Sequence, residues 1–216
     1  MVFRIFFLNV EPKVTYKKFN QNKLVVTYGG SFGLANALEP FINLIQNQED
    51  LVANIHFNLI GSGYLKERYS RKLASISNIT LIEKLDRIEF LHHLFDSDVA
   101  FISWANLSEI YKFGVSAQKY YDYMAAGIPI LSAQNGIDDP VRQSGCGIIV
   151  KNESNEICKG LNQFLTMSSL ERKNMGSLGK EYVKQFTYNR LSEKYIQLFS
   201  FFCLLIPLNH QSFLYL

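Results

Sequence analysis

From Lys23 onward, short apolar runs alternate with longer stretches in which apolar residues recur every three or four positions. The short runs are rich in β-branched and aromatic residues, which is typical of strands. They predict six strands, at residues 24–28, 56–60, 79–82, 99–103, 128–132 and 147–150. Strands that alternate with helices build a parallel sheet with crossover helices. The pattern therefore predicts an α/β fold, a Rossmann-like parallel sheet with flanking helices.

The stretches between these runs have helical spacing. In residues 35–46 the spacing places four apolar side chains on one helix face: Leu38, Phe41, Ile42 and Ile45. Similar spacing predicts helices at residues 65–76, 87–95 and 117–126. Further on, Ser168 precedes Glu171 by three positions, which is a capping-box pattern, and it predicts a helix that ends near Phe186.

The two ends of the chain depart from this pattern. Residues 1–22 fit no period and include KVTYKKFNQN, so we predict a linker or the remnant of a missing N-terminal domain, followed by one domain at residues 23–198. Residues 199–216 begin with FSFFCLLIPL, an apolar run shorter than the ~20 residues needed to cross a bilayer. Such a tail indicates an interface for a partner or a membrane surface, or else a shifted reading frame, and in either case a tendency to self-associate.

Composition narrows the classes of function. The chain has 216 residues, 48% of them hydrophobic, which is enough for one sizeable core. A net charge of +3 gives no strong field, so we expect no nucleic-acid partner. Cys146, Cys158 and Cys203 lack the spacing of a zinc site and are interpreted as reduced core thiols of a cytoplasmic protein. The short N-terminal run MVFRIFFLNV has no cleavage site, so no signal peptide is indicated.

Two glycine-rich loops follow the first two predicted strands. The first contains Gly29, Gly30 and Ser31, and the second contains Gly61, Ser62 and Gly63. Because ligands of parallel sheets bind at the carboxyl ends of strands, both loops lie where a ligand is expected. Glycines let the backbone approach a ligand closely, and a following helix N-terminus attracts phosphate. An ordinary tight turn explains either loop alone, but together they favour a nucleotide-type ligand.

A third candidate region lies at the start of the predicted helix at residues 117–126. Ser116 is placed to cap this helix, and Lys119 and Asp122 lie three positions apart on it. A carboxylate can accept hydrogen bonds from a ribose diol, and a lysine can offset the charge of phosphates. A surface ion pair between Lys119 and Asp122 is the alternative interpretation.

Three segments together resemble a known family. FGVSAQKYYDYMAAGIPIL is similar to the long motif of the C-terminal, nucleotide-sugar (donor) binding domain of GT-B glycosyltransferases of the retaining group 1 type. YGGSFGLANALE and LIGSGYLKE resemble the first and second strand loops of the same domain. Such enzymes build capsular and O-antigen polysaccharides. The matches follow the family's order from Lys23 to about Phe199.

This resemblance implies transfer of a sugar from a nucleoside-diphosphate sugar to a polysaccharide or lipid-linked acceptor, with no metal and no further cofactor. Within it, Asp122 matches the acid that holds the ribose hydroxyls, Lys119 the conserved lysine, and Gly29 and Gly30 the diphosphate loop. The resemblance also implies a cytoplasmic location, with peripheral contact at the inner face of the membrane.

The sequence departs from the family in ways that leave the catalytic residues unassigned. Tyr111 stands where many relatives have the first Glu of an EX7E motif, and Glu109 lies only nearby. The segment LAN at residues 34–36 replaces a basic residue that many relatives keep after the first glycine loop. The acceptor-binding domain has no counterpart in residues 1–22. A truncated or partner-dependent nucleotide-sugar binding module is therefore the alternative, and a nucleotide-sugar epimerase is a further one. A dehydrogenase would need a GxGxxG loop, which this sequence lacks.

Overall fold

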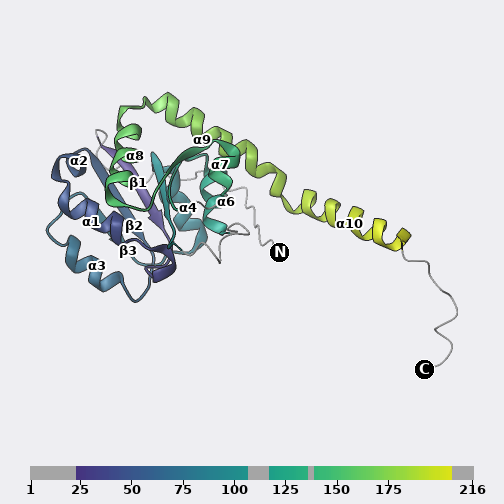
Figure 1. Ribbon diagram of the computed structural model, residues 1–216, viewed down its shortest axis with the longest axis horizontal. Coiled ribbons are helices and arrows are strands. Elements are labelled where there is room, and N and C mark those ends of the chain that lie inside the picture. Colours follow the sequence, from purple (N-terminus) through teal and green to yellow (C-terminus); the bar gives the residue numbers. More distant parts are fainter. Residues whose placement is uncertain (1–22, 107–116, 136–138, 206–216) are drawn as a thin grey trace, which may run out of the picture.

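The structure, a computed structural model, describes residues 23–106, 117–135 and 139–205 (Figure 1). Several sequence-based expectations therefore lie outside the described residues. They are the linker at residues 1–22, the end of the tail at 206–216, and the roles considered for Glu109, Tyr111 and Ser116.

A single parallel sheet forms the centre of the described structure. Its order is β3-β2-β1-β4-β5-β6, and every neighbouring pair runs in parallel. The strands are β1 (Leu24–Gly29), β2 (Ile55–Ile60), β3 (Ile79–Ile82), β4 (Val99–Ser103), β5 (Ile130–Ala133) and β6 (Gly147–Val150). The predicted α/β class with a Rossmann-like sheet is confirmed.

β5 begins two residues later than the sequence predicts. Gly127 adopts the left-handed conformation that ends the preceding helix, with φ +72°. The amide of Ile128 still donates to the carbonyl of Tyr123, a helix-terminating bond of 3.1 Å. Residue 128 therefore belongs to the end of the helix, and the strand starts only after Pro129.

Helices cover both faces of this sheet (Figure 1). They are α1 (Glu39–Asn47), α2 (Glu49–Ala53), α3 (Lys66–Leu73), α4 (Arg87–Phe95), α6 (Gln118–Ala126), α7 (Pro140–Ser144), α8 (Ser154–Thr166), α9 (Ser169–Val183) and α10 (Tyr188–Leu205), with the short 3-10 helices η1 (Leu34–Asn36) and η2 (Lys184–Phe186). The helix predicted at residues 35–46 is thus split. Ala37 takes a left-handed conformation at φ +40°, and α1 restarts at Glu39 with Pro40 in its first turn.

The core is divided into two clusters by the sheet. On β4, Phe101 packs into one cluster, whereas its neighbours Ala100 and Ile102 pack into the other. This division follows from the alternation of side chains along a strand. The predicted apolar face of α1 is buried on the Phe101 side. Of the cysteines expected in the core, Cys146 is buried and Cys158 only half-buried, and both are free thiols.

The N-terminus of α9 carries the capping box that the sequence predicts. The Ser168 hydroxyl accepts from the amide of Glu171 at 3.2 Å, and the Glu171 carboxylate accepts from the amide of Ser168 at 2.7 Å. The exposed serine that follows, Ser169, is the first residue of the helix rather than its cap.

We therefore expect Ser168→Ala to lower the free energy of unfolding by about 1 kcal/mol, because an amide at the helix N-terminus loses its acceptor. Urea denaturation measures this loss. Ser169→Ala is the matched control and should change stability by less than about 0.5 kcal/mol. Equal effects of the two substitutions would contradict a capping role for Ser168.

The last described helix, α10, leaves the body of the domain (Figure 1). It carries exposed apolar side chains, among them Ile196, Phe199 and Phe201 at 64%, 66% and 58% exposure. The helix is continuous across residue 198, where the sequence suggested that a separate tail begins. Within the described residues, no helix has both the length and the apolar character needed to span a membrane.

Candidate functional site

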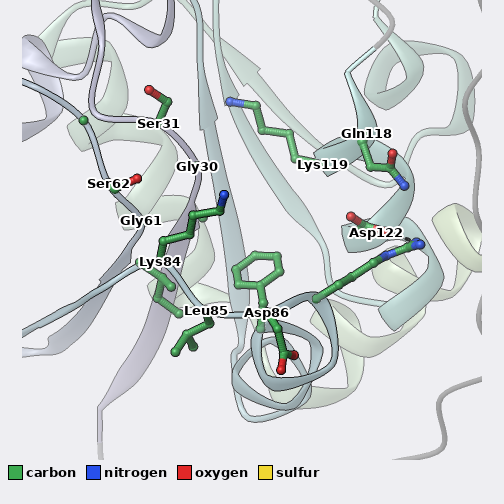
Figure 2. A pocket seen from close by; sticks show the side chains of 15 residues that line it. Gly30, Ser31, Gly61, Ser62, Lys84, Leu85, Asp86, Gln118, Lys119 and Asp122 are labelled. Atoms are coloured by element: carbon green, nitrogen blue, oxygen red, sulfur yellow. Dashed lines mark hydrogen bonds and ion pairs between the residues drawn. The ribbon is translucent and has the colours of Figure 1, made fainter.

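A cleft of about 670 Å³ opens at the carboxyl ends of β1, β2 and β3 (Figure 2). Its walls are the loops that follow these strands and the first turns of α4 and α6. It is lined by Gly29, Gly30, Ser31, Ile60, Gly61, Ser62, Gly63, Lys84, Leu85, Asp86, Arg87, Phe90, Gln118, Lys119 and Asp122. Eight of the nine residues singled out from the sequence thus line one cleft, and the ninth, Ser116, lies outside the described residues.

The two glycine loops pack directly against each other to form the floor of the cleft. The amide of Gly30 donates to the carbonyl of Ile60 at 3.0 Å, and that of Phe32 to the carbonyl of Ser62 at 2.9 Å. A Cβ atom at Gly61, which has φ +144°, would lie 1.9 Å from the carbonyl oxygen of Gly30. Glycine is therefore required at residue 61 by the contact between the loops, with or without a ligand.

The expectation of a helix N-terminus directly behind the first loop is wrong. The loop leads into η1, a 3-10 helix of three residues, and α1 begins only at Glu39. The left-handed Ala37 separates the two. Any anion held by the first loop would therefore meet the loop itself and the side chains around it, and not the end of α1.

Lys119 reaches from α6 towards the first glycine loop (Figure 2). Its Nζ donates to Oδ1 of Asn36 at 2.5 Å and lies 4.5 Å from the ring centroid of Trp104 and 5.6 Å from that of Tyr28. Burial of the ammonium lowers the pKa of Lys119 to about 8. A buried ammonium that faces rings and an amide gains strongly from an anion placed beside it.

Asn36 connects this lysine to the loop. While its Oδ1 accepts from Lys119, its Nδ2 donates to the carbonyl of Ser31 at 2.8 Å. The sequence indicated only that a basic residue is missing from the segment at residues 34–36. In the structure, an amide at this place orients the cation that α6 supplies.

Asp122 lies on the same helix, at the other side of the cleft. The residue is only 8% exposed, and its Oδ1 lies 2.6 Å from Nη2 of Arg87. Burial raises the pKa of the Asp122 carboxyl, while the Arg87 guanidinium works in the opposite direction. The ion pair considered from the sequence, between Lys119 and Asp122, is replaced by the pair between Arg87 and Asp122.

Sequence reasoning missed Arg87 and Lys84, which also line the cleft. Both follow β3, whose carboxyl end lies at the same edge of the sheet as the two glycine loops. That position was the available signal, because every loop at this edge can reach a ligand. Among the described residues, the cleft is therefore lined by the cationic side chains of Lys84, Arg87 and Lys119, and Asp122 is paired with Arg87.

The wall formed by α6 is fixed to β1 by buried contacts. The Tyr123 hydroxyl accepts from the amide of Gly29 at 3.0 Å and donates to its carbonyl at 3.2 Å. The ring of Phe90 lies where a Cβ of Gly29 would be, with 2.2 Å between the two positions. At the start of α6 the N-cap position is occupied by Ala117, without a side-chain cap.

No protein-family model matches this sequence, and no curated protein sequence matches it. Solved structures do match its fold. WaaG, a glycosyltransferase involved in lipopolysaccharide biosynthesis, gives a TM-score of 0.59 at 15% identity, over 76% of this chain and 43% of WaaG. Sucrose-phosphate synthase from Thermosynechococcus elongatus gives 0.63 at 16%, over 83% and 46% of the two chains. A mutant of TarM from S. aureus, in complex with Fondaparinux, alpha-GlcNAc-glycerol and UDP, gives 0.64 at 15%, over 88% and 38%.

These neighbours establish the fold of the chain. It is the fold of the C-terminal half of GT-B glycosyltransferases, as the resemblance in the sequence suggested. The chain spans less than half the length of each of these three structures.

Proposed function

We propose that this chain binds a nucleoside-diphosphate sugar in the cleft and serves as the donor-binding part of a glycosyltransferase. The observation that carries the proposal is the convergence of two glycine loops, Lys119 and the Asp122–Arg87 pair on one cleft at the carboxyl edge of the sheet. The cleft's volume of about 670 Å³ falls within the ~300–1,000 Å³ range of small-molecule sites. Two structural neighbours carry the kind of ligand proposed: UDP in TarM and UDP-2-fluoro glucose in a protein from E. coli.

In this proposal each end of the cleft recognises one part of the ligand. Lys119 and Ser31 of the first glycine loop, which both line the cleft, face the diphosphate. Arg87 occupies Oδ1 of Asp122, which leaves lone pairs on the carboxylate for the ribose hydroxyls. The proposal includes no metal and no cofactor besides the donor, since the cations of the chain itself are placed to neutralise the diphosphate.

The share of the structural neighbours that this chain covers supports a second candidate function. The chain covers only 38–46% of the three structures compared above. A binding module that transfers sugar only together with an acceptor-binding domain or subunit would have this extent. Turnover of a nucleotide-sugar by the chain alone and after addition of such a partner distinguishes the two candidates.

The acceptor itself is proposed from the resemblance in the sequence: a polysaccharide or a lipid-linked sugar, in capsule or O-antigen assembly. A cytoplasmic location with peripheral membrane contact belongs to the same proposal. The exposed apolar side chains of α10 support it, because a surface of this kind usually marks an interface.

The affinity for a nucleoside diphosphate should fall as the pH rises through 8. The pKa of Lys119 is lowered to about 8 in the empty cleft, and a bound diphosphate favours the charged lysine and raises this pKa. Binding therefore takes up a proton above pH 8 and weakens by up to about tenfold per pH unit until the pKa of the complex is reached. Calorimetry with UDP from pH 7 to 9.5 measures the slope.

Lys119→Met is the control for this pH dependence, and its weaker binding should be independent of pH over the same range. The empty protein should show the opposite trend in stability. Because the pKa of Lys119 lies at about 8 when folded against 10.5 for an ordinary lysine, the unfolded chain binds more protons in between, and stability rises with pH in this window. A wild-type affinity that is constant from pH 7 to 9.5 would contradict the role given to Lys119.

A further inference from the structure

A chain of buried hydrogen bonds lies behind Lys119, on the side away from the cleft. The indole Nε1 of Trp104 donates to the hydroxyl of Tyr120 at 2.6 Å, and this hydroxyl donates to Oδ2 of Asp139 at 3.1 Å. The hydroxyl of Ser132 donates to the same oxygen at 2.8 Å. Trp104 is 7% exposed and the other three residues are fully buried. None of the four lines the cleft.

One end of this chain of hydrogen bonds is Oδ2 of Asp139, and the other carboxylate oxygen of Asp139 caps a helix. Oδ1 accepts from the amide of Arg142 at 3.1 Å and so caps α7. One carboxylate therefore joins four segments: the end of β4, the helix α6, the strand β5 and the start of α7. Buried polar groups stabilise a single arrangement only when all of them have partners, and these hydrogen bonds meet that condition at the Asp139 carboxylate.

The other end of this chain of hydrogen bonds is the ring of Trp104, which faces Lys119. The ring of Trp104 is stacked with that of Tyr120, with centroids 6.1 Å apart and planes inclined by 28°. The Nζ of Lys119 lies 4.5 Å from the Trp104 centroid. Since an ammonium is attracted by the face of an indole and not by its edge, the orientation of this ring decides where the ammonium is stabilised. Tyr120, the residue of α6 that follows Lys119, sets that orientation through its hydrogen bond with the indole.

We propose that Tyr120 and Asp139 are positioning residues of the cleft. They fix the plane of the Trp104 indole, and the indole keeps the Lys119 ammonium directed at the first glycine loop. That the anion received there is a diphosphate rests on the proposed function; the positioning itself does not. Tyr120 and Asp139 act only through Trp104 and touch no ligand.

The surroundings of Lys119 allow its titration to be identified. Tyr28 of β1, Asn36 of η1 and Trp104 face its ammonium, while Lys84 and the Arg87–Asp122 pair lie elsewhere on the walls of the cleft. Burial raises the pKa of Tyr28 well above 10, out of the range in which Lys119 titrates. A change near pH 8 in the environment of the indole therefore reports the lysine.

Trp104 is the single tryptophan of the protein, so the tryptophan fluorescence reports the environment of this indole alone. We expect the emission of the full chain, titrated from pH 6.5 to 9.5 without nucleotide, to change with a midpoint near 8, and Lys119→Met to abolish the change. In Tyr120→Phe the indole loses its acceptor. The emission should then shift and the midpoint should move by about half a pH unit or more. Asp139→Asn should move it in the same direction.

Tyr121→Phe is the matched control, since Tyr121 is the next residue of α6 and packs on Phe186 instead of Trp104. It should leave the titration unchanged. Circular dichroism establishes that each variant is folded, and Asp139→Asn tests the chain of hydrogen bonds independently should Tyr120→Phe not fold. A wild-type midpoint in folded Tyr120→Phe or folded Asp139→Asn would overturn the proposal, as would a transition that persists in Lys119→Met.

Binding of UDP separates this proposal from the proposed function. If the cleft takes a diphosphate, Tyr120→Phe should weaken binding about three- to tenfold, within the range of a lost hydrogen bond, and Tyr121→Phe should not. If neither the wild type nor any variant binds UDP, the proposed function fails. The fluorescence titration then still decides whether Tyr120 and Asp139 position Lys119.

Discussion

Lys119→Met is expected to weaken binding of a nucleoside diphosphate by about 2–5 kcal/mol, the range for removing one partner of a buried charge pair. The substitution keeps the length of the side chain but removes its ammonium, which donates to Asn36 and faces Trp104. A bound diphosphate would then lie in a partly buried cleft without the cation that α6 supplies. Isothermal titration calorimetry with UDP, GDP and ADP measures the loss directly.

Lys173→Met is the matched control, because Lys173 is an exposed lysine of α9 and does not line the cleft. Its affinity for the same nucleotides should equal that of the wild type. Thermal denaturation of both variants shows whether the cleft is intact. Equal affinities of the wild type and a folded Lys119→Met variant would remove Lys119 from the binding site.

Asp122→Asn is expected to weaken binding of a ribonucleoside diphosphate by about 1–3 kcal/mol, the scale of a lost hydrogen bond to a charged group. The amide that replaces the carboxylate accepts more weakly from the ribose hydroxyls and no longer offsets the charge of Arg87. The substitution preserves the shape of a side chain that is 8% exposed, so the cleft should keep its form.

A ligand without the ribose hydroxyls separates the two roles of Asp122. A 2′,3′-dideoxynucleoside diphosphate should bind the wild type and Asp122→Asn with similar affinity, since this ligand has no ribose hydroxyl for either protein to hold. If the variant loses the same affinity for both ligands, Asp122 acts only through its ion pair with Arg87. Unchanged affinity for both would leave it as a structural partner of Arg87 alone.

Most of the sheet could be predicted from the sequence, because buried parallel strands appear as short apolar runs between turns. The helices were harder to predict where the backbone geometry of single residues overrides the apolar periodicity. The segment at residues 35–46 has a regular apolar face, yet Pro40 and the left-handed Ala37 restrict the helix to Glu39–Asn47. In α8, Gly160 weakens the helical pattern, but it lies where a Cβ would come within 2.6 Å of Leu131, so a small residue lets this helix approach β5.

The cleft was predictable where its residues belong to one local motif. The glycine loops, Lys119 and Asp122 each lie in a short segment whose pattern can be recognised. Arg87 could not be assigned in this way, because it meets Asp122 across 35 positions of sequence and only the fold brings α4 and α6 together. The role of Asn36 as the partner of Lys119 depends on a similar contact, across 83 positions.

Calorimetric titration of the full chain with UDP, GDP and ADP at pH 7 tests the central claim most directly, that the cleft is a nucleoside-diphosphate site. The account predicts saturable binding of at least one of the three, with one ligand per chain, and its loss in a Lys119→Met, Asp122→Asn double variant that remains folded. Absence of binding by the wild type to all three at millimolar concentration, or equal binding by the double variant, would contradict it.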